Sequence, residues 1–253
     1  MNSKVRNINA KKTPSPAHVS SAPIRTFVVD IGGTGIKALV LNEIGEPMCE
    51  RLRVPTPETT TPAAVIKVIK RLAKQAGKFD RVSVGVPGTV RSGVTTGVVN
   101  LGPEWDHFHL TKTLSAIFGK PVRAANDADM QGFGAISGNG LELVLTLGTG
   151  VGSSLFVDGR LVPNVRVGKN RLRKEELERI GKKRWNRRLG KVVAKLERMF
   201  QYDRLYIGGG NAAMVDIRLL PGNVTIVSNL NGVLGGIALW QESHITKESA
   251  ASK

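Results

Sequence analysis

The chain has 253 residues, 41% of them hydrophobic, which is enough apolar material for one large domain or two lobes and excludes a disordered protein. The net charge of +17 indicates polyanionic ligands, but it does not choose among nucleic acid, polyphosphate, nucleotides and anionic membranes. The single cysteine excludes an internal disulfide and favours a reducing compartment, the cytoplasm, and no apolar run reaches the roughly 18 residues that a membrane span needs.

The first 24 residues differ from the rest in composition. They are basic and polar, contain three prolines and lack the apolar stretch of a secretory signal. We expect residues 1–24 to be a disordered basic leader, with an amphipathic targeting peptide as the alternative. An N-terminal α/β lobe is expected at residues 25–138 and a C-terminal α/β lobe, with a short polar tail, at residues 139–253.

Elements of the first lobe alternate between strands and helices. Short apolar runs predict the strands, whereas the spacing of Val65, Ile66 and Ile69 predicts a helix that Gly77 ends. We expect strands at residues 26–31, 37–42, 47–54, 81–86 and 122–125, and helices at residues 62–74, 110–118 and 129–136.

The second lobe repeats this plan, because it also opens with two strands joined by a glycine turn. We expect strands at residues 141–147, 152–157, 160–162, 204–207 and 224–227, and helices at residues 174–200 and 232–240. Gly181 and Gly190 weaken the long helix and are expected to interrupt it. The repeat predicts two α/β lobes with a ligand cleft between them, at the carboxyl ends of their strands.

Three glycine-rich segments each follow a predicted strand. They are DIGGTGIK at residues 30–37, LGTGVG at 147–152 and YIGGGN at 206–211. Glycine lets backbone N–H groups approach an anion, so three such turns suggest one phosphate-rich ligand. The first segment lacks the order of a P-loop, and it is followed by a strand where a dinucleotide fingerprint requires a helix.

Two carboxylates near strand ends have the chemistry of phosphoryl transfer. Asp30, at the mouth of the first glycine turn, is placed to hold Mg²⁺ through water, with simple capping of the turn as the alternative. Asp127, in the pair Asn126-Asp127, suits a general base for a sugar hydroxyl, although Asn-Asp is also a common turn pair.

The positive charge is concentrated between Arg160 and Arg204, where 16 Lys or Arg face five Asp or Glu. A solvated helical face is one interpretation of such a run. Its position between the second and third glycine segments favours the other interpretation, which is a track for a chain-like polyanion.

The order of several motifs resembles that of ROK-family sugar kinases, and most closely that of the polyphosphate glucokinase branch. The segments that carry the resemblance lie in consistent order over residues 26–240 and are DIGGTGIK (30–37), GVPGT (85–89), NDAD (126–129), LTLGTGVGS (145–153), GKKRW (181–185), IGGGN (207–211) and GGIALW (235–240). The resemblance implies two actin-like (ribonuclease H-like) lobes, and phosphoryl transfer from polyphosphate or ATP to a hexose with Mg²⁺. It also implies a homodimer.

Residue roles follow from the same resemblance. Asp127 resembles the catalytic base, and the acceptor-binding set is Gly88, Thr89, Asn126 and Asp127. The phosphate-binding set is Gly32, Gly33, Thr34, Gly35, Lys37, Gly148, Thr149, Gly150, Gly208, Gly209 and Gly210. The polyphosphate track is expected at Lys182, Lys183, Arg184, Arg187 and Arg188.

The chain departs from the family at the acceptor. Where the family carries a Glu and a His that hold the sugar, this sequence has Arg166 and Lys169, which donate hydrogen bonds only. A weakened or inactive binder of polyphosphate or sugar is therefore the alternative function.

A nucleic-acid-binding protein is suggested by charge alone, without a recognised motif. His107 and His109 form a His-x-His pair with no third ligand nearby, so we do not expect a metal there.

Overall fold

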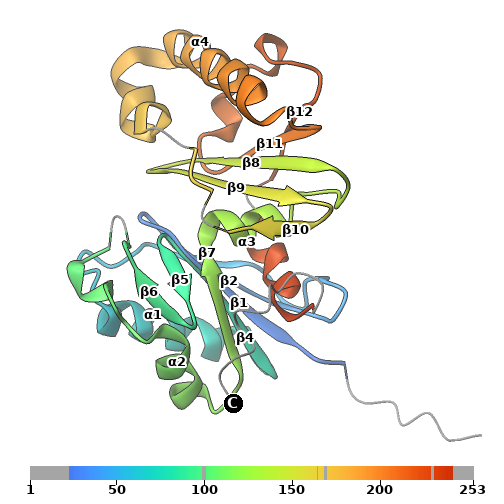
Figure 1. The fold of residues 1–253 in the computed structure, drawn as a ribbon. Helices are drawn as coiled ribbons and strands as arrows, with labels where there is room; N and C mark the ends of the chain where they lie inside the picture. Colours follow the sequence, from blue (N-terminus) through green and yellow to red (C-terminus); the bar gives the residue numbers. More distant parts are fainter. Residues whose placement is uncertain (1–22, 99–100, 164, 168–169, 229–230, 242–253) are drawn as a thin grey trace, which may run out of the picture.

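A computed structural model describes residues 23–98, 101–163, 165–167, 170–228 and 231–241 of the chain. The two sheets in Figure 1 have matching topologies, with an antiparallel pair of strands followed by parallel ones. The first sheet has the order β3-β2-β1-β4-β7, formed by Leu52–Val54, Ile36–Leu41, Thr26–Ile31, Arg81–Val86 and Val122–Asn126. The second has the order β10-β9-β8-β11-β12, formed by Arg160–Val162, Val151–Val157, Leu141–Leu147, Arg204–Gly208 and Val224–Ile226. The predicted two-lobe α/β repeat is confirmed.

Two helices cover one face of the first sheet. In α1 (Pro62–Ala76), the Thr61 side chain accepts a hydrogen bond from the N–H of Ala64, and a proline occupies the first turn, where its missing N–H costs nothing. In α2 (Leu110–Phe118), a left-handed Gly119 ends the helix. The apolar stripes of both helices join the strands in one buried core. These bounds agree with the prediction within two residues.

One long helix, α4 (Lys174–Phe200), covers the second sheet (Figure 1). Its buried Trp185, Leu189 and Val193 pack against the leucines of β8 and β11. Gly181 has φ 74° and ψ 157°, which a residue with a side chain rarely adopts, and this divides α4 into two segments at the predicted place. Gly190 does not interrupt the helix, so that expectation was wrong.

A short helix, α3 (Asp127–Phe133), lies between the two sheets (Figure 1). Its Met130 packs with Val28 of the first sheet, and the hydroxyl of Ser154 in the second sheet donates a hydrogen bond to Ala128 O, at 3.1 Å. Because α3 follows β7 directly, the last residue of that strand and the first of the helix are fixed at the junction of the lobes.

The C-terminal segment packs on the first sheet, although it follows the second in sequence. After α5 (Asn231–Leu234), a 3₁₀ segment, η5 (Gly235–Trp240), places the Trp240 ring 4.8 and 4.6 Å from the guanidinium carbons of Arg81 and Arg123. The Trp240 indole also donates to the Ser83 hydroxyl, at 2.8 Å. The proposed boundary at residues 138 and 139 divides the sheets, but it leaves this segment apart from the sheet that it contacts.

Several bounds differ from prediction for local reasons. The expected strand at 47–54 shrinks to Leu52–Val54, because Pro47 forms only an isolated bridge with Leu41. A hairpin of β5 (Thr89–Arg91) and β6 (Val94–Thr96) was not expected. Most of the expected leader lies outside the described residues. In the part of the chain that the structure describes, no helix is long and apolar enough to cross a membrane.

Candidate active site

The junction of β7 and α3 is held by the side chain of Asn126. This buried amide accepts hydrogen bonds from the N–H groups of Ala128 and Asp129, at 3.0 and 3.4 Å, and it donates to Gly88 O, at 2.8 Å. The cap starts α3 at Asp127, two residues before the predicted start. The predicted acceptor residues Gly88, Asn126 and Asp127 are therefore linked by direct contacts.

Asp127 lies in surroundings that favour its neutral form. Burial is the main cause, the charge of Asp30 adds to it, and together they raise the pKa of Asp127 to about 7. A hydrogen bond from the N–H of Ala128, at 2.9 Å, and the positive charge of Arg166 act in the opposite direction. A carboxyl group with a pKa near neutrality is suited to accept a proton at physiological pH.

A second carboxylate, Asp129, shares this environment and was missed in the sequence analysis. Burial raises the pKa of Asp129 to about 7 as well, again opposed by Arg166. Its position two residues after Asp127, within the same capped helical turn, was the available signal. The two groups titrate in the same range, so a pH profile of the site reports both of them.

The first glycine turn joins β1 and β2 and contains Gly32, Gly33, Thr34 and Gly35. It is closed by the N–H of Gly32 donating to Gly35 O, at 3.1 Å, and is held to the following loop by the Thr56 hydroxyl, which donates to Gly32 O at 2.6 Å. Beside it, the Lys37 ammonium of β2 lies 2.6 Å from Oδ2 of Asp30. The predicted metal ligand Asp30 therefore has a protein cation on one carboxylate oxygen.

The second and third glycine segments are bound to each other. Gly148, Thr149 and Gly150 form the turn between β8 and β9, and the N–H of Gly148 donates to Gly150 O, at 2.9 Å. Asn211, after the third segment, donates from its N–H to Leu147 O, at 2.8 Å, and from its amide to Gly148 O, at 3.4 Å.

Gly208 ends β11, and Gly209 and Gly210 follow it, so both predicted phosphate segments lie at the carboxyl ends of adjacent parallel strands. They approach α3, since a Cβ added at Gly152, just after the second turn, would meet Ala128.

Gln131 is a further residue at this junction that the sequence did not reveal. Its side chain is 9% exposed, and its amide nitrogen has no hydrogen-bond partner among the described residues. A Cβ added at Gly208 would collide with this amide, so Gln131 lies directly against the third glycine segment. A buried donor without a partner fits a site that receives an oxygen atom from a ligand or from water.

Arg166 connects the two lobes across the site. It follows β10 in the second lobe, and its guanidinium donates to the hydroxyl of Thr89 in the first lobe, at 2.8 Å. Arg166 is exposed, and the structure gives it no ion pair with a described carboxylate, although its charge lowers the pKa of both Asp127 and Asp129. Of the two cations expected to replace sugar ligands, Arg166 contacts Thr89 beside the site, and Lys169 lies outside the described residues.

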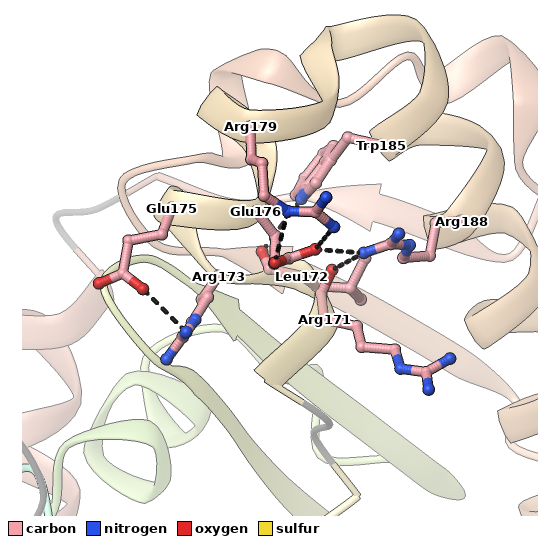
Figure 2. A network of polar contacts seen from close by, with 8 residues as sticks. All are labelled: Arg171, Leu172, Arg173, Glu175, Glu176, Arg179, Trp185 and Arg188. Carbon is pink, nitrogen blue, oxygen red and sulfur yellow. Dashed lines mark hydrogen bonds and ion pairs between the residues drawn. The ribbon is translucent and has the colours of Figure 1, made fainter.

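The predicted polyphosphate track lies on α4, but its residues differ in their contacts. Lys182, Lys183, Arg184 and Arg187 are exposed. Arg188 contacts Glu176, at 2.7 Å, and also donates to Arg171 O, at 3.0 Å, as Figure 2 shows. Arg188 therefore holds the 3₁₀ turn η2 (Asn170–Leu172) against α4, and its Nη1 makes both of these contacts within the protein.

In the described part of the chain, no group of three or more His, Cys, Asp or Glu is arranged to hold an ion, around the histidine pair or elsewhere. A Mg²⁺ site does not require such a cluster, because Mg²⁺ keeps several waters and binds through one or two carboxylates together with substrate phosphates. Asp30 fits that arrangement, because only its Oδ2 contacts Lys37.

Comparisons with known proteins agree with the motif order. The family model described as "ROK family" matches residues 26–168. The polyphosphate glucokinase of Mycobacterium leprae is 29% identical over 247 residues, covering 88% of this chain and 76% of that protein. That of Mycobacterium tuberculosis H37Rv is 30% identical over 234 residues, covering 83% and 88%.

Solved structures show the same fold. The inorganic polyphosphate/ATP-glucomannokinase of Arthrobacter sp. strain KM has a TM-score of 0.74 and 30% identity, covering 87% of this chain and all of that one. The ROK glucokinase of Streptomyces griseus, solved with glucose and AMPPNP, has a TM-score of 0.70 at 18% identity, covering 86% and 99%. The chain therefore belongs to the ROK family.

Proposed function

We propose that this protein is a sugar kinase that transfers a phosphoryl group from polyphosphate or ATP to a hydroxyl group of a hexose. The observation that carries the proposal is Asp127, a carboxylate with a pKa near 7 at the carboxyl end of β7, close to the second glycine turn. The names of the relatives support the same activity, because they are polyphosphate glucokinases and a polyphosphate/ATP-glucomannokinase.

In the proposed mechanism, Asp127 accepts the proton of the attacking hydroxyl group. The hydroxyl oxygen forms a bond to the terminal phosphorus, and the bridging P–O bond breaks, so the donor leaves one phosphate shorter. Asn126 fixes Asp127, and one N–H of its amide remains for the acceptor, with Gly88 and Thr89 beside it. Backbone N–H groups of the three glycine segments, with Lys37, would bind donor phosphates.

Magnesium would be held by Asp30 and the donor phosphates, and its positive charge would neutralise the negative charge on the phosphate oxygens. The remaining stabilisation of the phosphate charge would come from Lys37 and the backbone N–H groups of the glycine segments.

We also propose that the protein works in the cytoplasm as a homodimer. Sedimentation velocity of the full chain tests the dimer, which a monomer at micromolar concentration would contradict.

A coupled assay tests the proposed function directly. Purified full-length protein is incubated with glucose, mannose or other hexoses, separately with polyphosphate and with ATP, and formation of the sugar phosphate is measured. We expect turnover of at least one hexose with at least one donor. Polyphosphate binding without turnover of any sugar would contradict the proposal and favour the inactive alternative.

The raised pKa predicts a pH dependence. A general base acts only when deprotonated, so kcat/KM should fall as the pH drops below about 7. Arg166→Ala removes a cation that lowers the pKa of Asp127, so the acid limb of the profile should move to higher pH. Arg166→Lys, which keeps the charge, should retain most of the wild-type profile.

The contribution of the neighbouring carboxylate must be separated from this result. Asp129→Asn removes the second group that titrates near neutrality, and an acid limb should persist in that variant because Asp127 remains. Identical pH profiles for wild type and Arg166→Ala would show that Arg166 does not act on the base.

A further inference from the structure

The positive charge of α4 is distributed unequally between its two segments. Before the break at Gly181, the cations are paired with carboxylates of the same segment. Figure 2 shows Arg179 with Glu176, at 2.9 Å, and Arg173 with Glu175, at 2.9 Å, while Arg188, from beyond the break, also contacts Glu176, at 2.7 Å. These ion pairs pull the pKa of Glu176 down to about 2. The end of α4 near the glycine turns is therefore largely neutralised by its own acids.

The segment after Gly181 has exposed cations without such partners. Besides Lys182 and Lys183, five of them are exposed, and none of these five has an ion pair within the residues that the structure describes. We name this set the α4 stripe, and it consists of Arg184, Arg187, Lys191, Lys195 and Arg198. Successive members are three or four residues apart, so all five lie on one face of the helix.

This face points to solvent, because the opposite face of α4 packs on the second sheet through Trp185, Leu189 and Val193. At 1.5 Å per residue the stripe is about 21 Å long. Like charges three or four residues apart repel one another, so an anionic chain along the stripe would relieve that repulsion. The stripe thus has the shape and charge of a site for a linear polyanion.

The direction of α4 relates the stripe to the proposed donor site. The N–H of Lys174, at the start of α4, donates to Gly148 O in the second glycine turn, at 2.7 Å. Beyond its other end, the N–H of Asp203 donates to Leu141 O at the start of β8, the end of the strand opposite Gly148. The helix therefore leads away from the glycine turn toward the far edge of the sheet.

The chemistry of the stripe distinguishes between two linear polyanions. Single-stranded nucleic acid is usually bound by cations together with exposed aromatic rings on which bases stack. Trp185 is fully buried, and the large exposed hydrophobic residues of the described chain include no aromatic one. A chain of phosphates without bases needs only cations.

We propose that the α4 stripe is a docking surface for the part of a long polyphosphate chain that extends beyond the donor site. The proposal rests on the proposed function, since it assigns a donor class to the same enzyme. It moves the expected track toward the end of the helix. Arg184 and Arg187 are retained, and Lys191, Lys195 and Arg198 are added. Arg188 is left out because it contacts Glu176 and Arg171.

A charge-matched pair of variants tests this. The stripe variant is Lys191→Gln, Lys195→Gln and Arg198→Gln. The control is Lys67→Gln, Lys70→Gln and Lys74→Gln, which removes the same charge from an exposed face of α1 on the other lobe. Binding of fluorescent long-chain polyphosphate and of tripolyphosphate is measured at several salt concentrations, and KM is measured for long-chain polyphosphate and ATP.

We expect the stripe variant alone to bind long-chain polyphosphate about tenfold or more weakly, with the slope of log K against log salt reduced by about two. Tripolyphosphate binding, the KM for ATP and kcat should change little. A Lys191→Arg and Lys195→Arg variant, which preserves charge, should bind as the wild type does. Thermal melting of each variant confirms that the fold is retained.

Equal weakening in the stripe and control variants would show that only net charge matters and would overturn the proposal, as would no weakening in either. Displacement of polyphosphate by a single-stranded oligonucleotide of the same charge, at equal concentration, would also overturn it. Because binding is measured without a sugar, these results stand even if no hexose is turned over, so failure of the docking surface and failure of the proposed function are distinguishable.

Discussion

Asp127→Asn is expected to lower kcat for phosphoryl transfer by about 10² to 10⁴, the usual contribution of a general base. The amide has the size of the carboxylate but cannot accept the proton of the attacking hydroxyl. Its oxygen can still accept the hydrogen bond from the N–H of Ala128, so the start of α3 should be preserved. Because burial disfavours the charged form of Asp127, its removal should leave the melting temperature at pH 8 unchanged or higher.

Asp129→Asn is the matched control for this result. It removes the same charge from the same helical turn, where burial raises the pKa of Asp129 as well. Both variants are compared with wild type by steady-state kinetics at saturating hexose and by polyphosphate binding. If Asp127→Asn retained half of the wild-type kcat, Asp127 would not be the base. A loss of similar size in both variants would indicate that the reaction depends on the charge of the cluster.

Secondary structure with a strong local signal could be predicted well from the sequence. The helix at Leu110–Phe118 and the strands at Arg81–Val86 and Leu141–Leu147 were placed with both ends as observed. Their apolar periodicity and glycine boundaries are local properties. The hairpin of β5 and β6 has only three residues in each strand, and it is held by contacts such as the Thr95 hydroxyl with Trp105 O, ten residues away, which an apolar pattern over such short strands does not indicate.

The candidate site was predictable where it follows strand ends. Asp30, Asp127 and the glycine segments lie there, and a shared edge of a sheet brings such residues together. Contacts between distant residues were not predictable. The bond from Arg166 to Thr89 joins positions 77 residues apart, and the partners of Arg188 depend on how α4 folds back at Gly181. The sequence thus predicted the charge of α4, but not which cations remain unpaired.

The glycines of the proposed donor site divide into those that the fold needs and those that it does not. Gly209 has φ 89°, and a Cβ there would collide with the backbone of Leu147. Gly148 and Gly210 are not among the glycines with a positive φ, and a Cβ at either would meet nothing within 4 Å. No packing contact explains why these two positions lack a side chain, whereas close approach of donor phosphates to the backbone would.

We therefore expect Gly148→Ala and Gly210→Ala to fold as the wild type does but to raise the KM for the phosphoryl donor. A methyl group inserted against a bound phosphate typically costs about 1–3 kcal/mol, so the increase should be about 5- to 150-fold for each variant. The KM for polyphosphate and for ATP should rise together, because both donors would present their terminal phosphates to the same backbone N–H groups, whereas the KM for the hexose should change little.

Gly209→Ala provides the contrast, because strain at a positive φ and the collision with Leu147 should destabilise the fold by about 1–3 kcal/mol or more. At about 2–4 °C per kcal/mol for a chain of this size, its melting temperature should fall clearly, which neither of the other variants should show. The site is tested by whether the KM for the donor and the melting temperature change in different variants. If Gly148→Ala and Gly210→Ala left the KM for both donors unchanged while remaining folded, the space beside these glycines would not receive the donor, and the phosphate-binding role of the second and third segments would be wrong.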